Sequence, residues 1–207
     1  MRATDCIARA FSTMFHPLLM PTIGIFILFQ LNTYVSFSLT PEARRFIMLI
    51  IFLNTALVPV FSILVLKHTG YIRDLLLDSR GERILPLTVA AVMFFLTYYL
   101  LLQTSLPSLI YFFVMGGTIL VLLSLMVSFL WKISLHMVSL GGVTGFLIIT
   151  ALLLRIEVSW MIASVFLVSG LTGASRIHLK AHSPAQVYTG YLLGVAAMLL
   201  LFLYLKT

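Results

Sequence analysis

Apolar segments of membrane-spanning length dominate this chain. A helix needs about 20 mostly apolar residues to cross a bilayer, and seven segments of the 207-residue sequence come close to that length. They cover residues 18–37, 46–65, 84–102, 108–131, 137–154, 158–173 and 187–205. Only 9% of the residues are charged, against about 25% in a soluble domain. The sequence therefore predicts an all-α integral membrane protein, a bundle of about six or seven transmembrane helices, and excludes soluble, disordered and fibrous chains.

The sequence shows no internal repeat, no low-complexity tract and no shift in composition that would mark a domain boundary. We therefore expect residues 1–207 to form a single polytopic membrane domain. The formal net charge is +7, but no basic helix or arm stands apart from the apolar segments, so nucleic acid is not an expected partner. Membrane lipids and a phosphorylated substrate fit this charge better.

Basic residues and histidines gather on one side of the predicted membrane. Seven crossings place the two termini on opposite faces, and the face of the N-terminus receives nine of the 13 basic residues. All five histidines, His16, His68, His136, His178 and His182, lie on or near the same face. The positive-inside rule assigns that face to the cytoplasm, but the rule does not account for histidines. We therefore expect the chemistry of the protein at this face, where three polar clusters meet.

The first cluster covers residues 67–86. Arg73 and Arg80 are seven residues apart, which is about two helical turns and places them on one stripe of a helix. Asp74 and Asp78 are four apart and share the neighbouring stripe. The segment therefore predicts either an amphipathic helix in the membrane interface, closed at Gly81 and restarted beyond it, or a solvated loop with internal ion pairs.

The second cluster, residues 131–136, opens the fifth predicted span. We expect Ser134 to cap this span by accepting a hydrogen bond from its first-turn amides. The amides and the helix dipole favour a bound anion at such a terminus, and His136 would lie beside it. The simpler interpretation is that Trp131 and Lys132 anchor the helix at the interface, which leaves His136 unexplained.

The third cluster, residues 175–186, joins the sixth and seventh predicted spans. Arg176 offers a planar fork suited to phosphate oxygens. His182 and Gln186 are four residues apart at the start of the last predicted helix, and Pro184 suits its first turn. Small residues follow in both of the helices that the second and third clusters open, and they permit close helix packing. They are Gly141, Gly142 and Gly145 in one helix and Gly190 and Gly194 in the other.

The three clusters together resemble the signatures of the type-2 phosphatidic acid phosphatase superfamily, the lipid phosphate phosphatases. Ser175, Arg176 and His182 match the pattern S-R-x5-H-x3-D, with Gln186 in place of the Asp. Ser134 and His136 match the pattern P-S-G-H, with Ile133 and Leu135 in place of Pro and Gly. Arg73 and Arg80 have the spacing of K-x6-R-P, with Arg for Lys and Gly81 for Pro. The resemblance covers a phosphatase-like core of about residues 67–207.

The resemblance implies phosphoryl transfer through a phosphohistidine, without a metal or another cofactor. His182 would be the nucleophile, and His136 would protonate the leaving alkoxide and then activate water. Arg73, Arg80, Arg176, Ser134 and Ser175 would bind the phosphate. The implied substrate is a phosphomonoester or diphosphate of a lipid or polyprenol. We expect the protein in a bacterial inner (cytoplasmic) membrane. The charge bias favours a cytoplasmic active face, whereas the resemblance favours the opposite face.

Gln186 leaves other interpretations open, because an amide oxygen can accept a hydrogen bond from His182 but carries no charge. The enzyme would then be slow, or would recruit Asp74, Asp78 or Glu82, or would be a non-catalytic lipid-binding or transport protein. A metal site made of His136, His178, His182 and Asp78 is a further alternative. A membrane prenyl or phosphotransferase that holds Mg²⁺ with Asp74 and Asp78 is another.

Overall fold

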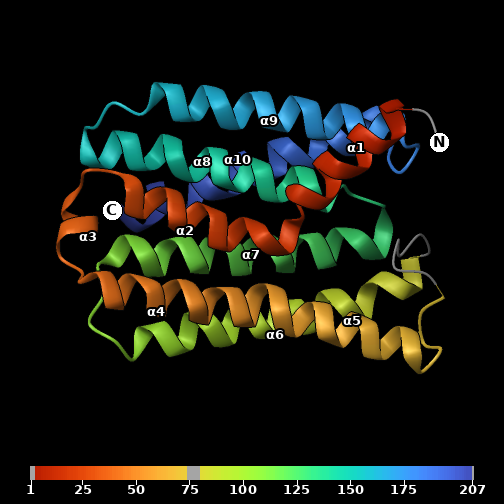
Figure 1. The fold of residues 1–207 in the computed structure, drawn as a ribbon, viewed down its shortest axis with the longest axis horizontal. Helices are drawn as coiled ribbons and strands as arrows, with labels where there is room; N and C mark the ends of the chain where they lie inside the picture. The colour runs from red at the N-terminus through yellow and green to blue at the C-terminus, as the bar shows by residue number, and fades with distance from the viewer. Residues whose placement is uncertain (1–2, 74–79, 207) are drawn as a thin grey trace. The chain divides into compact units, whose positions relative to one another are not determined.

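The computed structural model describes residues 3–73 and 80–206, and this part of the chain contains helices and no strands (Figure 1). In chain order the elements are α1 (Ala3–Met14), the 3-10 turn η1 (Pro17–Leu19), α2 (Met20–Gln30), α3 (Tyr34–Phe37), α4 (Pro41–Phe52), the π-helical segment η2 (Leu53–Leu57), α5 (Val58–His68), α6 (Arg80–Leu102), α7 (Ser108–Leu130), α8 (Leu135–Leu154), α9 (Ser159–His178) and α10 (Pro184–Lys206).

Seven helical stretches in the described residues are long and apolar enough to cross a membrane. They are Thr4–Gln30, Pro41–His68, Gly81–Leu102, Ser108–Leu130, Leu135–Leu154, Ser159–His178 and Pro184–Tyr204. The predicted fold class, an all-α integral membrane protein, is therefore confirmed. Large apolar side chains remain exposed along these stretches, as expected where the solvent is lipid; Phe166 on α9 and Leu200 on α10 are examples.

Three of the predicted spans differ from the helices by five residues or more at one end or both. The second, expected from residue 46, begins at Pro41, and the first, expected to end at residue 37, ends at Gln30. The first was expected from residue 18, but it begins at Thr4, because α1 mixes polar and apolar residues and Pro17 begins a new turn rather than ending the helical path. Proline is tolerated at the first position of a helix, where its missing N–H has no partner to lose. The sixth span was expected to end at residue 173, whereas α9 continues to His178.

The expected helix break at Gly81 is wrong. α6 begins at Arg80 and continues through both Gly81 and Pro86. Pro86 lies in the second turn, where it removes one backbone hydrogen bond without ending the helix. Of the rest of the predicted interfacial helix, Lys67 and His68 end α5, and residues 69–73 are not helical. Residues 74–79, which include Asp74 and Asp78, lie outside the described residues, and so does the Arg80 side chain.

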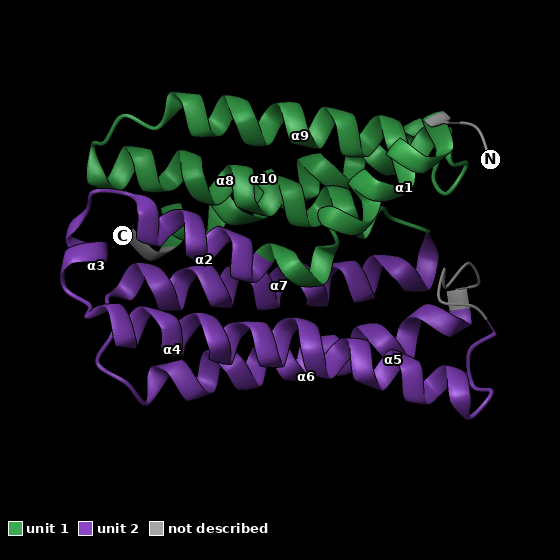
Figure 2. Ribbon diagram, in the orientation of Figure 1, with its two compact units in different colours: residues 1–20, 132–207 green, residues 21–131 purple. Residues whose placement is uncertain are grey.

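The chain divides into two compact units (Figure 2). Unit 1 comprises residues 1–20 and 132–207, and unit 2 comprises residues 21–131. That residues 1–207 form a single domain stays a prediction. Unit 2 pairs α6 with α7 and packs η2 and α5 against α6, and within it the ring of Phe94 lies 3.4 Å from the position that a Cβ on Gly117 would take.

Unit 1 is built around α8. Of the most apolar 18-residue stretch of α8, 67% is buried, against 22% for that of α9. α10 packs along α8 through the predicted glycines: a Cβ at Gly145 would lie 2.9 Å from the carbonyl oxygen of Val195, and one at Gly194 would overlap the carbonyl oxygen of Val138. The two backbones are therefore in direct contact. α9 also packs against α8, and α1 lies along the C-terminal end of α9 (Figure 1).

Candidate active site

The third cluster forms the turn between α9 and α10. Ser175 and Arg176 belong to the last turns of α9, which ends in a Schellman motif: the N–H of Lys180 donates to the carbonyl of Ile177 (2.9 Å), and the N–H of Ala181 donates to the carbonyl of Arg176 (3.1 Å). Lys180 takes the left-handed conformation that this motif requires (φ 54°). His182 follows two residues later, so that the turn holds it close to Arg176, whose carbonyl also accepts from the His182 N–H at 3.3 Å.

A capping box opens α10. The backbone N–H of Ser183 donates to Oε1 of Gln186 (3.2 Å), and the N–H of Gln186 donates to Oγ of Ser183 (3.4 Å). This reciprocal pair, with Pro184 at the first helical position, is a known way to satisfy the free amides of a helix start. It also identifies the Gln186 atom that faces His182 as the amide oxygen, because only the oxygen can accept from the Ser183 N–H.

The orientation of Gln186 decides the proton position on His182. Nδ1 of His182 lies 3.0 Å from Oε1 of Gln186, which is the expected hydrogen bond. Since Oε1 can only accept, Nδ1 must carry the proton, and the lone pair of the neutral ring lies on Nε2. Only 7% of His182 is exposed, so neighbouring protein groups hold this orientation.

His136 lies in the first turn of α8 and is 9% exposed. Its Nε2 lies 2.9 Å from the backbone carbonyl oxygen of Ser12 in α1. A carbonyl oxygen is an acceptor only, so Nε2 donates and the proton that the ring can exchange belongs to Nδ1. The imidazole of His16 packs against it, with ring centroids 5.5 Å apart and planes at 78°.

Charge links these groups. The positive charge of Arg176 acts electrostatically on both His16 and His136, and His182 also acts on His136. Arg176, His136 and His182 are therefore neighbours at the end of unit 1 where α9 ends and α8 and α10 begin. Ser175 is buried beside them, and its Oγ donates to the carbonyl of Leu171 (2.8 Å), which leaves the oxygen lone pairs to accept.

Ser134 occupies the N-cap position of α8, but the expected capping hydrogen bond is absent. Its backbone N–H donates to the carbonyl of Gln186 (3.4 Å), and its own carbonyl accepts from the N–H groups of Met137 and Val138 (both 3.0 Å), so the Ser134 backbone joins the start of α8 to α10. Its Oγ is fully buried and has no hydrogen-bond partner within the described part of the chain. A buried hydroxyl in that state needs a partner of its own, and a phosphate oxygen can supply one.

The structure thus brings together His136, His182, Gln186, Arg176, Ser134 and Ser175 in unit 1. Arg73 and Arg80 belong to unit 2, where the backbone N–H of the exposed Arg73 donates to Oε1 of Glu82 (3.1 Å). Their part in a phosphate clamp stays a prediction. No group of three or more His, Cys, Asp or Glu side chains in the described residues could hold a metal ion, and Asp78, which the metal alternative needs, lies outside those residues.

Two contacts of the site were missing from the sequence prediction. The sequence places His16 on the same face as the other histidines without indicating a contact for it, and it does not indicate the carbonyl of Ser12. The available signal was the placement of His16 directly before Pro17, where a helix must restart. A backbone carbonyl carries no signature in the sequence.

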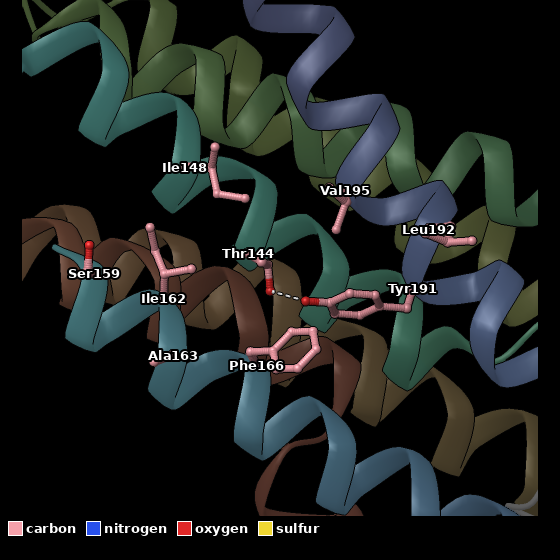
Figure 3. A pocket seen from close by; sticks show the side chains of 9 residues that line it. All are labelled: Thr144, Ile148, Ser159, Ile162, Ala163, Phe166, Tyr191, Leu192 and Val195. Atoms are coloured by element: carbon pink, nitrogen blue, oxygen red, sulfur yellow. Dashed lines mark hydrogen bonds between the residues drawn. The ribbon is translucent and has the colours of Figure 1, made fainter.

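An apolar cavity of about 460 Å³, broadly open at the surface of unit 1, lies between α8, α9 and α10 (Figure 3); two of its lining side chains, Phe166 and Leu192, are exposed. Its lining residues are Thr144, Ile148, Ser159, Ile162, Ala163, Phe166, Tyr191, Leu192 and Val195. Tyr191 donates its hydroxyl to Oγ1 of Thr144 (3.0 Å), and Phe166 packs edge-on against the Tyr191 ring at 6.2 Å. Tyr191 lies seven residues beyond Pro184, about 10 Å along the helix at 1.5 Å per residue.

No protein-family model, no curated protein and no solved structure matches this chain.

Proposed function

We propose that this integral membrane protein is a phosphatase that hydrolyses a phosphomonoester or diphosphate of a lipid or polyprenol through a phosphohistidine at His182, as its resemblance to the lipid phosphate phosphatases implies. The observation that carries the proposal is the pair of hydrogen bonds to Oε1 of Gln186, because they direct the lone pair of His182 to Nε2. A buried imidazole held in one tautomer beside a guanidinium is suited to attack a phosphate.

In the first step, Nε2 of His182 forms a bond to phosphorus and the bond from phosphorus to the ester oxygen breaks. The bound phosphate dianion favours the protonated form of the His136 ring. The leaving oxygen takes the Nδ1 proton of that ring, and the lipid alcohol departs, or the lipid monophosphate when the substrate is a diphosphate. In the second step, Nδ1 of His136 takes a proton from water, the water oxygen bonds to phosphorus, and the P–N bond breaks with its electron pair returning to Nε2. Inorganic phosphate leaves and the starting state is restored.

The surrounding groups stabilise charge during this reaction. Arg176 supplies positive charge for the phosphate oxygens, and the Ser134 hydroxyl supplies a donor that has no other partner in the described residues. Gln186 stabilises the positive phosphohistidine ring with a dipole instead of a full charge. In a serine-protease triad the corresponding change from Asp to Asn lowers turnover by about 10⁴-fold, so we expect this enzyme to be slow.

The apolar cavity supports a substrate with a lipid chain. It lies within the membrane-spanning part of the same three helices that carry the site, and its volume of about 460 Å³ is within the usual range for ligand pockets. The same cavity also favours a second candidate function, a non-catalytic lipid-binding protein, in which Gln186 serves only the capping box of α10.

Phosphate release separates these functions. Purified protein in lipid nanodiscs is given dioleoyl phosphatidic acid or undecaprenyl diphosphate in the presence of EDTA. We expect phosphate release that vanadate inhibits, that His182→Ala abolishes, and that the matched variant His68→Ala leaves unchanged, because His68 is an exposed histidine at the end of α5. Retained release in His182→Ala would contradict the mechanism. Bound lipid without release would favour the lipid-binding function, and release only when EDTA is replaced by Mg²⁺ would favour a transferase.

A further inference from the structure

The N-terminal segment is fastened to α8, which carries His136, and to α9, which carries Arg176. Near the beginning of α1, Oδ1 of Asp5 lies 3.0 Å from Nε2 of His178 in the last turn of α9. Near its end, the carbonyl of Ser12 accepts the hydrogen bond from His136 in α8. The turn η1, which follows, packs against α8. The N-terminal partners in these contacts, Asp5, Ser12 and η1, lie outside the three clusters that the resemblance uses.

His16 contributes a ring contact at this junction. It is the N-cap residue of η1, and its Nδ1 accepts a long hydrogen bond from the Leu18 N–H (3.4 Å). A ring nitrogen that accepts has its lone pair there, so the proton of the neutral His16 ring lies on Nε2. The near-perpendicular arrangement with His136, 5.5 Å between centroids, is a favourable edge-to-face geometry. The His16 ring thereby restricts the rotation of the His136 ring.

We propose that α1 and η1 form part of the active site, with the Ser12 carbonyl selecting the proton-exchanging nitrogen of His136 and His16 acting as a positioning residue that holds the His136 ring in place. A ring free to rotate could present either nitrogen to the substrate, and only one of them would face the leaving group. The carbonyl holds Nε2–H, so Nδ1 exchanges the proton. The kinetic part of this inference rests on the proposed phosphatase function, whereas the tautomer of His136 does not depend on it.

The direct test is the tautomer of His136 in protein labelled with ¹⁵N-histidine, with its signals assigned by their loss in His136→Asn. In wild-type protein without substrate, at a pH where the His136 ring is neutral, we expect a pyrrole-type signal for Nε2 and a pyridine-type signal for Nδ1. Ser12→Ala should leave both signals in place, because the carbonyl remains and the Ser12 hydroxyl has no partner in the described residues. His16→Ala should give a mixture of tautomers, and His68→Ala should not.

Kinetic measurements distinguish a His16 that positions the His136 ring from a His16 that only stabilises the fold. We expect His16→Ala to lower kcat by about ten- to a hundredfold, the scale of a misplaced catalytic group, with little change in KM. His16→Phe keeps a flat ring against His136 and should restore most of kcat and the single tautomer. A neutral wild-type His136 ring that carries its proton on Nδ1 would overturn the inference, and so would an unchanged tautomer and kcat in His16→Ala. If the wild type releases no phosphate, the phosphatase proposal fails, and the tautomer measurements alone then decide the role of α1.

Discussion

The first turns of α8 and α10 lie side by side, and each helix has a serine at its N-terminal boundary, but the two serines are used differently. Ser183 closes the start of α10 in a reciprocal pair with Gln186. Ser134 has the N-cap position of α8, yet its buried Oγ has no partner in the described residues. The serine at the start of α10 thus has its hydrogen-bond partner within its own helix. The serine at the start of α8 instead keeps a buried hydroxyl that a bound phosphate could accept from.

This difference indicates that the starts of the two helices have different roles in the proposed site. The start of α10 fixes the orientation of the His182 ring, because the amide oxygen of Gln186 both caps the helix and accepts a hydrogen bond from His182. The α8 side provides the unsatisfied hydroxyl and the second histidine. Four substitutions separate these roles, from the largest expected effect to the smallest.

Gln186→Glu should raise turnover, with a ceiling of about 10⁴-fold, the factor that a carboxylate contributes in the serine-protease triad. Glutamate at the third helical position keeps the capping box, so the substitution changes the charge next to His182 and preserves the start of α10. The measurement is kcat for phosphate release, with Gln186→Met as a control that should lower it. An unchanged or lower rate in a folded Gln186→Glu protein would count against Gln186 as the partner of the nucleophile.

Ser134→Ala should lower kcat by about 10²- to 10³-fold, the usual cost of removing one donor to transition-state charge. Its thermal stability should stay the same or rise slightly, since the lost hydroxyl is buried and has no partner in the described part of the chain. Turnover and melting temperature measured on one preparation test both statements. A lower melting temperature with unchanged turnover would make Ser134 an ordinary structural residue.

Gly194→Ala should destabilise the protein by about 1–3 kcal/mol, the usual cost of overpacking. Its Cβ would overlap the Val138 carbonyl oxygen and lie 2.7 Å from the Gly142 nitrogen, which forces α10 away from α8. The matched variant is Gly170→Ala in α9, where a Cβ meets nothing within 4 Å. Thermal unfolding in nanodiscs compares the two, and equal melting temperatures would mean that the close contact between the helices does not hold the two serines together.

Ser183→Ala should cost about 1 kcal/mol of stability through the lost cap. Its effect on turnover should be much smaller than that of Ser134→Ala, because Oε1 of Gln186 keeps its bonds to the Ser183 backbone and to His182. In a direct comparison, Ser183→Ala should lower the melting temperature with little loss of kcat, whereas Ser134→Ala should lower kcat with no loss of melting temperature. The same balance in both variants would remove the distinction between the two helix starts.

The sequence could predict the membrane helices and much of the α8–α10 contact. Apolar segment length identified the spans, and Gly141, Gly145 and Gly194 indicated the close packing that the structure contains. Hydropathy failed for α1, where Thr4, Asp5 and Arg9 interrupt the apolar residues and the packing of the helix on α9 compensates for them.

The site was predictable only in part. The spacing of His182 and Gln186 indicated their hydrogen bond, because residues four apart meet at a helix start. The failure of Ser134 to cap α8 depends on the approach of α10, and the bond from Ser12 to His136 joins residues 124 positions apart through a backbone oxygen. Neither feature leaves a local pattern in the sequence.

Trapping of the phosphoenzyme tests the central claim, that His182 is the nucleophile. Protein mixed with ³²P-labelled phosphatidic acid and quenched rapidly should carry a label that is stable in base and labile in acid, and peptide mapping should locate it on His182. The label should be absent from His182→Ala and present in His68→Ala. A label on another residue, or phosphate release by the His182→Ala protein, would contradict the account.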